Sequence, residues 1–236
     1  MNDVKHTTMV TLGGWAMILF AVLFVGITLS IDHLAQSQPL LYGMEQHNLF
    51  KVAVGSTMIR NLLLIYALLP LLLIPGAVGV FYTFSEKYSP NMLVGLCFAT
   101  LGALALAISL LLLPSMSWQL VSYIQNMPSA TQSNMILLLQ SVHSYFGILV
   151  GDVLGFGCLL VWFFIVSFVM LYSNMPRIIG LIELIITICA TVILLLRFAD
   201  ITPTIHMMIR FPIIITLWIF ICGIVLVSLH KAKERS

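Results

Sequence analysis

The stretch 144-SYFGILVGDVLGFGCLLVWFFIVSFVMLY-172 contains one charged residue, Asp152, among aliphatic, aromatic and glycine residues. A helix needs about 20 predominantly apolar residues to cross the roughly 30 Å hydrocarbon core of a bilayer. The stretch exceeds that length, so it predicts a membrane-spanning helix. The apolar run begins at Met135, but a second span would need a tight turn, and only single glycines are available for one. We therefore expect one spanning helix, preceded by an interfacial turn over residues 130–143.

The rest of the chain has the same character, since 61% of its residues are hydrophobic and 8% are charged. A soluble protein of this length would need a far more polar surface. Further segments of spanning length run over about 9–31, 61–82, 92–113, 177–196 and 211–229. We therefore expect an all-α fold, a polytopic transmembrane helical bundle of six spans that forms a single membrane domain over residues 1–236.

An even number of spans places both termini on one side of the membrane, and the basic residues indicate which side. Six Lys and Arg residues fall on the side of the termini and four on the opposite side. Basic residues are enriched in cytoplasmic loops, so both termini are predicted to be cytoplasmic. The shorter loops on that side and the basic cluster that follows Leu229 agree with this prediction.

Several classes of site are disfavoured by the residue pattern. The cysteines fall inside predicted spans, which favours packing over a disulfide framework: Cys97, Cys158, Cys189 and Cys222. His33, Glu45 and His47 lack the helical spacing typical of metal ligands, and His143 and His206 lie at the membrane edge, where a haem is disfavoured. We expect no metal, no cofactor and, at a net charge of +2, no nucleic-acid partner.

Asp152 is the deepest acidic residue in the predicted span 144–172, and an ionisable residue at membrane depth is a candidate functional residue. Gly147, Gly151 and Gly155 recur at a spacing of four, which predicts a ridge that another helix can approach closely. Asp152 flanks this ridge. It either belongs to a binding site or holds two helices together through a hydrogen bond, and the second interpretation is favoured because such bonds are common.

Basic residues at the span edges suggest a second group of candidates. Arg60, Arg197 and Arg210, together with His143, lie at the same predicted outer depth as Asp152. Turned inward, the arginines would form a basic vestibule suited to an anionic headgroup or a small acid. Turned outward, they would contact lipid phosphates, and we favour this interpretation because arginines at helix ends usually do so.

Glu183 lies about six residues into the predicted span 177–196, with no partner evident from the sequence. A carboxyl group there would serve a proton path or form a hydrogen bond with a neighbouring Ser or Thr. Pro70 and Pro75 interrupt the predicted span 61–82. We interpret them as a kink, although broken helices also form ion and substrate sites.

Two segments share a weak pattern, "VFYTFSEKYSPNMLVGL" at 80–96 and "VSFVMLYSNMPRIIGLI" at 166–182. Each leaves the membrane through an aromatic run, turns at a Ser/Asn-rich proline site and re-enters through an aliphatic segment with a glycine. With six spans, both turns are expected on the cytoplasmic side. The pattern is compatible with a duplicated hairpin.

The chain also resembles a known family, on three stretches: "QSVHSYFGILVGDVLGFG" at 140–157, "LYSNMPRIIGLIELI" at 171–185 and "FPIIITLWIFICGIVLVSLHKAKE" at 211–234. These resemble the small six-helix bacterial integral membrane proteins grouped as a domain of unknown function. The resemblance implies a six-span fold and a location in the bacterial inner membrane. It implies no activity and no catalytic residues.

Three functions remain open at this point. We expect a non-enzymatic helical bundle or an accessory subunit of a membrane complex, with membrane lipids and other subunits or a second copy of the chain as partners. The alternative is a small transporter, or a protein that binds lipid or an anionic ligand, using Asp152, Glu183 and the outer arginines. A membrane enzyme is the third possibility and lacks a recognisable catalytic set. An internal cavity that reaches Asp152 or Glu183 would favour the second function.

Overall fold

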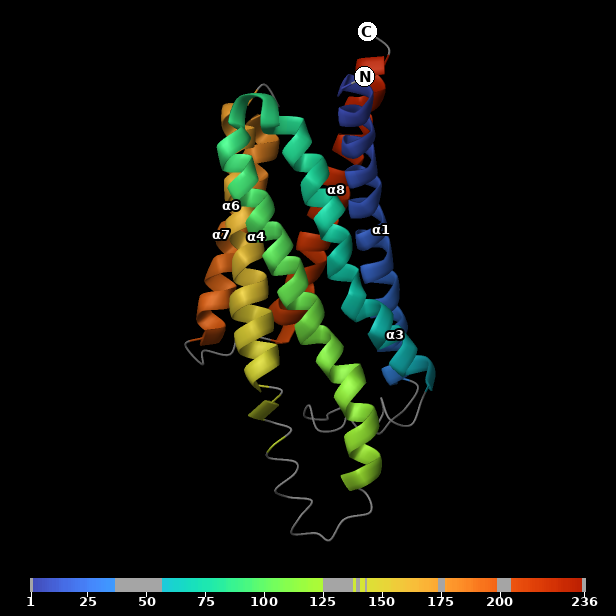
Figure 1. Cartoon of the computed structure of the whole chain (residues 1–236). Coiled ribbons are helices and arrows are strands. Elements are labelled where there is room, and N and C mark those ends of the chain that lie inside the picture. Colours follow the sequence, from blue (N-terminus) through green and yellow to red (C-terminus); the bar gives the residue numbers. More distant parts are fainter. Residues whose placement is uncertain are drawn as a thin grey trace.

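The computed structural model describes residues 2–36, 57–124, 138, 141–142, 144–173, 177–198 and 205–234. Every element within these residues is helical, which confirms the all-α prediction for this part of the chain. The elements are α1 (Asn2–Gln36), α3 (Thr57–Leu68), the 3-10 helix η1 (Leu69–Leu72), α4 (Leu73–Ile124), the π-helix η2 (Ser144–Phe156), α6 (Gly157–Tyr172), α7 (Arg177–Phe198) and α8 (Ile205–Glu234). Figure 1 shows them side by side in a bundle.

Within the described residues, four helical stretches are long and apolar enough to cross a membrane: Thr7–Ser30, Arg60–Leu112, Tyr145–Tyr172 and Arg177–Leu196. A shorter apolar stretch, Ile213–Ser228, lies in α8. The outward-facing side chains are apolar as well, with Ile178 69% exposed and Leu29 62% exposed. A protein with such a surface requires an apolar environment, as a membrane protein does. The number of spans and the side of the termini stay predictions.

The segments predicted at 61–82 and 92–113 belong to one continuous stretch, Arg60–Leu112, of 53 residues. Tyr88 interrupts it with non-helical angles of φ −125° and ψ 30°, so α4 consists of two arms that meet at a kink. Pro90, two residues farther along, favours a break here, because proline lacks the N–H that would bond to the carbonyl four residues earlier in a helix. Figure 1 shows the chain reversing direction between the two arms.

The apolar stretch ends at Leu112, close to the predicted end of the span at residue 113, but the helix α4 itself continues through Pro114 to Ile124. Pro114 lacks the N–H that would bond to the carbonyl of Leu110. The Ser115 hydroxyl donates to the carbonyl of the following residue, Leu111, at 2.7 Å. Of the interfacial turn predicted at 130–143, only 138 and 141–142 are described, and they are helical.

The two similar hairpins meet at one end of the bundle. The Tyr88 hydroxyl, at the turn of α4, donates to the carbonyl oxygen of Tyr172, at the end of α6, at 2.6 Å. Gly95 follows Pro90 by five residues and Gly180 follows Pro176 by four, and both glycines pack against α6. The start of α1 and the end of α8 lie at the same end of the bundle (Figure 1).

Glycines bring α1 into close contact with two other helices. A Cβ at Gly13 would lie 2.6 Å from the Cα of Gly79 in α4, and a Cβ at Gly14 would lie 2.8 Å from the carbonyl oxygen of Gly223 in α8. Consecutive helical residues point about 100° apart, so adjacent glycines open two faces of α1. Close backbone approach of this kind is typical of helix packing in membranes.

We predict that Gly13→Ala destabilises the bundle by about 1–3 kcal/mol, because the new methyl group would meet backbone atoms of α4 that cannot move aside. Thermal unfolding of the purified protein in detergent measures the effect. Gly26→Ala is the control, since nothing lies within 4 Å of its added Cβ. Equal unfolding temperatures for the two variants would contradict the close contact between α1 and α4.

Candidate functional site

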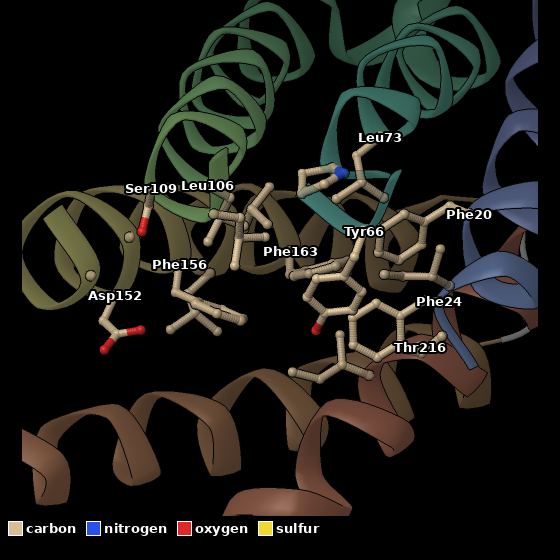
Figure 2. A pocket seen from close by; sticks show the side chains of 18 of the residues that line it. Phe20, Phe24, Tyr66, Leu73, Leu106, Ser109, Asp152, Phe156, Phe163 and Thr216 are labelled. Carbon is tan, nitrogen blue, oxygen red and sulfur yellow. The ribbon is translucent and has the colours of Figure 1, made fainter. Parts of the chain in front are cut away.

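The centre of the bundle contains a cavity of about 360 Å³. Side chains from α1, α3, η1, α4, η2, α6 and α8 line it, and most of them are apolar (Figure 2). The volume lies within the range of 300–1,000 Å³ that is typical of small-molecule sites. Such sites combine an apolar lining with a few polar groups that orient the ligand.

One end of the cavity is polar. Asp152 of η2 and Ser109 of α4 both lie there, on neighbouring helices (Figure 2). Asp152 is partly buried, and its Oδ2 atom is shielded from solvent. A carboxyl group in an apolar surrounding interacts strongly with any polar group placed beside it, because the local dielectric constant is low. This end of the cavity can therefore orient the polar part of a ligand.

The other end of the cavity is aromatic. The ring centroids of Phe24 and Tyr66 lie 5.3 Å apart, and those of Phe20 and Phe24 lie 5.8 Å apart. The Tyr66 hydroxyl points into the cavity (Figure 2). Tyr66 lies just before η1, where Pro70 interrupts the helix, so the predicted kink at Pro70 is a 3-10 turn at the cavity wall.

The predicted span 144–172 forms one helical stretch of spanning length, Tyr145–Tyr172, but its first half, Ser144–Phe156, is the π-helix η2 rather than an α-helix. A π-helix has i→i+5 hydrogen bonds and is rare, and where such turns occur within helices they are often at functional sites. Glycine is a poor α-helix former, and η2 holds three of the glycines noted in the sequence. Gly147, Gly151, Asp152 and Phe156 all line the cavity.

The glycine ridge of η2 packs partly against α4. Gly151 contacts Ser109, and a Cβ at Gly155 would lie 2.8 Å from the Cγ of Leu106. Gly102 of α4 makes the matching close approach, since a Cβ there would lie 2.8 Å from the carbonyl oxygen of Gly155. This close packing places Gly151 against Ser109, so that Asp152 and Ser109 lie toward the same end of the cavity (Figure 2).

Of the residues predicted to form a basic vestibule, the structure describes the side chain of Arg60 alone. Arg60 is half-buried in α3 and is absent from the cavity lining. The side chains of Arg197 and Arg210, and all of His143, lie outside the described residues. In the part of the chain that the structure describes, the cavity has one acidic lining residue, Asp152, and no basic one.

Glu183 lies apart from this cavity, in α7, where only 2% of it is exposed. It lines a smaller cavity of about 10 Å³ together with Thr187 of α7 and Trp218 of α8. The Thr187 hydroxyl donates to the carbonyl oxygen of Glu183 at 2.8 Å. Asp152 and Glu183 therefore belong to separate sites.

Sequence reasoning missed the other polar and aromatic members of these sites. Ser109, Thr216 and Trp218 stand singly in apolar helices, where a Ser, Thr or Trp usually has only a packing role. The spacing of Thr216 and Trp218 by two residues places them on different faces of α8, which explains why they line different cavities.

The described residues contain no group of three His, Cys, Asp or Glu side chains that would hold a metal ion. The four cysteines are free thiols. The side chains of His33, Glu45, His47 and His206 lie outside the described residues. Comparisons with protein-family models, with curated proteins and with solved structures found no match to this chain.

We predict that Gly155→Ala destabilises the protein by about 1–3 kcal/mol, because the added methyl group forces η2 away from α4 or moves Leu106 into the cavity. Gly157→Ala, two residues along the chain, is the matched control, since nothing lies within 4 Å of its added Cβ. Thermal unfolding in detergent measures both variants. If Gly155→Ala were as stable as Gly157→Ala, η2 and α4 would not be in close contact.

Proposed function

We propose that this chain is an integral membrane protein whose central cavity binds a small, mainly apolar molecule with one polar end. The main observation in support of this proposal is the cavity of about 360 Å³, which reaches the carboxyl group of Asp152. We place the apolar body of the ligand among the aromatic side chains of Phe20, Phe24 and Phe163, and its polar end beside Asp152 and Ser109.

The cavity favours ligand binding over the other two functions. A purely structural bundle or an accessory subunit has no need for an internal space of this size, because membrane helices gain stability from close packing. An enzyme needs several polar groups that converge on a reacting atom. Among the described lining residues, Asp152 and Ser109 are the polar pair at one end, whereas Tyr66 and Thr216 lie farther along the cavity.

The charges of the lining residues also limit the charge that the ligand can carry. A carboxyl group disfavours an anion, and no basic side chain is among the described lining residues. We therefore propose a ligand that is neutral or cationic at its polar end rather than the anionic ligand considered from the sequence. Hydrogen bonds to Asp152 and Ser109 would orient it. Transport of the same molecule is an extension of this proposal, since transporter sites lie near the bilayer midplane.

We further propose that the chain crosses the bacterial inner membrane six times, with both termini in the cytoplasm. The reversal of α4 at Tyr88 supports this topology, because it divides the stretch Arg60–Leu112 into two arms. The apolar stretch Ile213–Ser228 supplies the last span. The excess of Lys and Arg on the side of the termini supports the orientation.

Reporter fusions test the topology. We predict that a fluorescent protein fluoresces when fused to either terminus, whereas alkaline phosphatase fused there is inactive, because phosphatase folds only outside the cytoplasm. Phosphatase inserted between residues 37 and 56 should be active, since that segment is predicted to be external. Opposite locations for the two termini would require an odd number of spans and would contradict the proposal.

Native mass spectrometry of the protein, purified in mild detergent, tests the ligand. We predict a bound small molecule in the wild type. Ile148→Trp should remove it, because the larger side chain fills the lining of the cavity. Asp152→Asn should fold normally and weaken retention by about 10–100-fold, because a charged hydrogen bond contributes about 1.5–3 kcal/mol.

Leu149→Trp is the matched control, since Leu149 is adjacent, 53% exposed and not among the lining residues. It should retain the molecule as the wild type does. A wild-type protein that copurifies with no small molecule, or equal retention by the two tryptophan variants, would contradict the proposed function.

A further inference from the structure

A second, smaller cavity lies between α6, α7 and α8, with a volume of about 10 Å³. Leu160, Phe163 and Ile215 line both this cavity and the central one. The two spaces are therefore separated by a single layer of apolar side chains. The polar members of the small cavity are Glu183, Thr187 and Trp218, and the proposed ligand site uses none of them.

Two polar atoms of this cavity are buried and have no hydrogen-bond partner, Oε2 of Glu183 and Nε1 of Trp218. Glu183 is 2% exposed and Trp218 is 5% exposed. The indole N–H lies close enough to the carboxyl group to interact with it electrostatically, but the geometry between Nε1 and Oε2 does not meet that of a direct hydrogen bond. Buried polar groups nearly always have a partner, because an unsatisfied one is costly in an apolar surrounding.

The chemistry of the lining specifies what would complete the site. The indole N–H can only donate, whereas a carboxyl oxygen accepts. The Thr187 hydroxyl already gives its hydrogen to the carbonyl of Glu183, at 2.8 Å, so its oxygen remains able to accept. The missing molecule must therefore accept one hydrogen bond and donate two. A water molecule does this, and about three hydrogen bonds are usual for a buried water.

The size of the cavity agrees with this chemistry. A volume of about 10 Å³ is close to what one water molecule requires. A metal ion fits poorly, because the indole N–H turns its positive end toward the site. One carboxyl group and one hydroxyl group also fall short of the six or more oxygen ligands that Ca²⁺ and Mg²⁺ require.

We propose that Glu183, Thr187 and Trp218 bind a single internal water molecule, which bridges α7 to α8. The bridge has a structural consequence, because α7 packs along α6 and only slightly against α8. A water-mediated bond supplies a polar link where direct packing is sparse. The site also lies directly behind Phe163, so a displacement of that side chain by a ligand would open the water site to the central cavity.

A structure of the wild-type protein at a resolution that shows ordered water is the direct test. We expect a density peak within hydrogen-bond distance, about 2.7–3.2 Å, of both Trp218 Nε1 and Glu183 Oε2. A direct bond between the two side chains, or the absence of such a peak, would overturn the proposal. The result is independent of whether the central cavity holds a ligand.

Double-mutant cycles give a second test, with thermal unfolding in detergent as the measurement. Trp218→Phe removes the donor, and Thr187→Val removes the hydroxyl oxygen. If both contact the same water molecule, the double variant loses less than the sum of the single losses, by roughly 2 °C or more. A direct bond between Glu183 and Trp218 alone would make these two losses additive, and additivity would overturn the bridge.

Thr191→Val is the matched control. The Thr191 hydroxyl donates to the carbonyl of Thr187 at 2.9 Å, in the same way as Thr187 donates to Glu183, but Thr191 is not among the residues that line the small cavity. Its loss should add to that of Trp218→Phe. Equal coupling for Thr191 and Thr187 would indicate a general loosening of α7 and would overturn the specific bridge.

Discussion

The backbone of a chain in hydrocarbon has no water to bond with, so each of its N–H and C=O groups needs a partner within the protein. All regular structure in the described residues is accordingly helical. The 3-10 turn at Pro70 shows the same constraint, since the N–H of Leu73 bonds to the carbonyls of Leu71 and Pro70. Hydroxyl side chains also find partners within their own helix, since Thr28 and Thr100 donate to carbonyl oxygens one turn earlier.

Helices that satisfy their own backbones gain little from burying apolar surface against one another, because lipid is as apolar as they are. Close packing must hold them together, and glycine permits the closest approach. Gly13 meets Gly79, Gly14 meets Gly223, and Gly155 meets α4 near Gly102. These contacts bring α1 against α4 and α8, and η2 against α4. The central cavity lies among the same helices.

The two deep carboxyl groups then acquire different surroundings. Asp152 lies on the π-helix η2 and lines the central cavity, beside Ser109. Glu183 lies on α7 and lines a cavity with room for about one water molecule, beside Trp218. Leu160, Phe163 and Ile215 line both cavities. The bundle thus places a ligand-sized cavity and a water-sized cavity on either side of one layer of apolar side chains.

The sequence by itself determined the helical class, the approximate position of each apolar helix and the two acidic residues at membrane depth. These depend on the length of apolar runs and on rare charges, which are local properties. Only the tertiary structure decided that Asp152 faces a cavity, that Trp218 lies near Glu183, and that residues 144–156 form a π-helix. Apolar helices look alike on every face, so their sequence does not specify which faces meet. That choice depends on the fit of glycines and side chains between helices far apart in the chain.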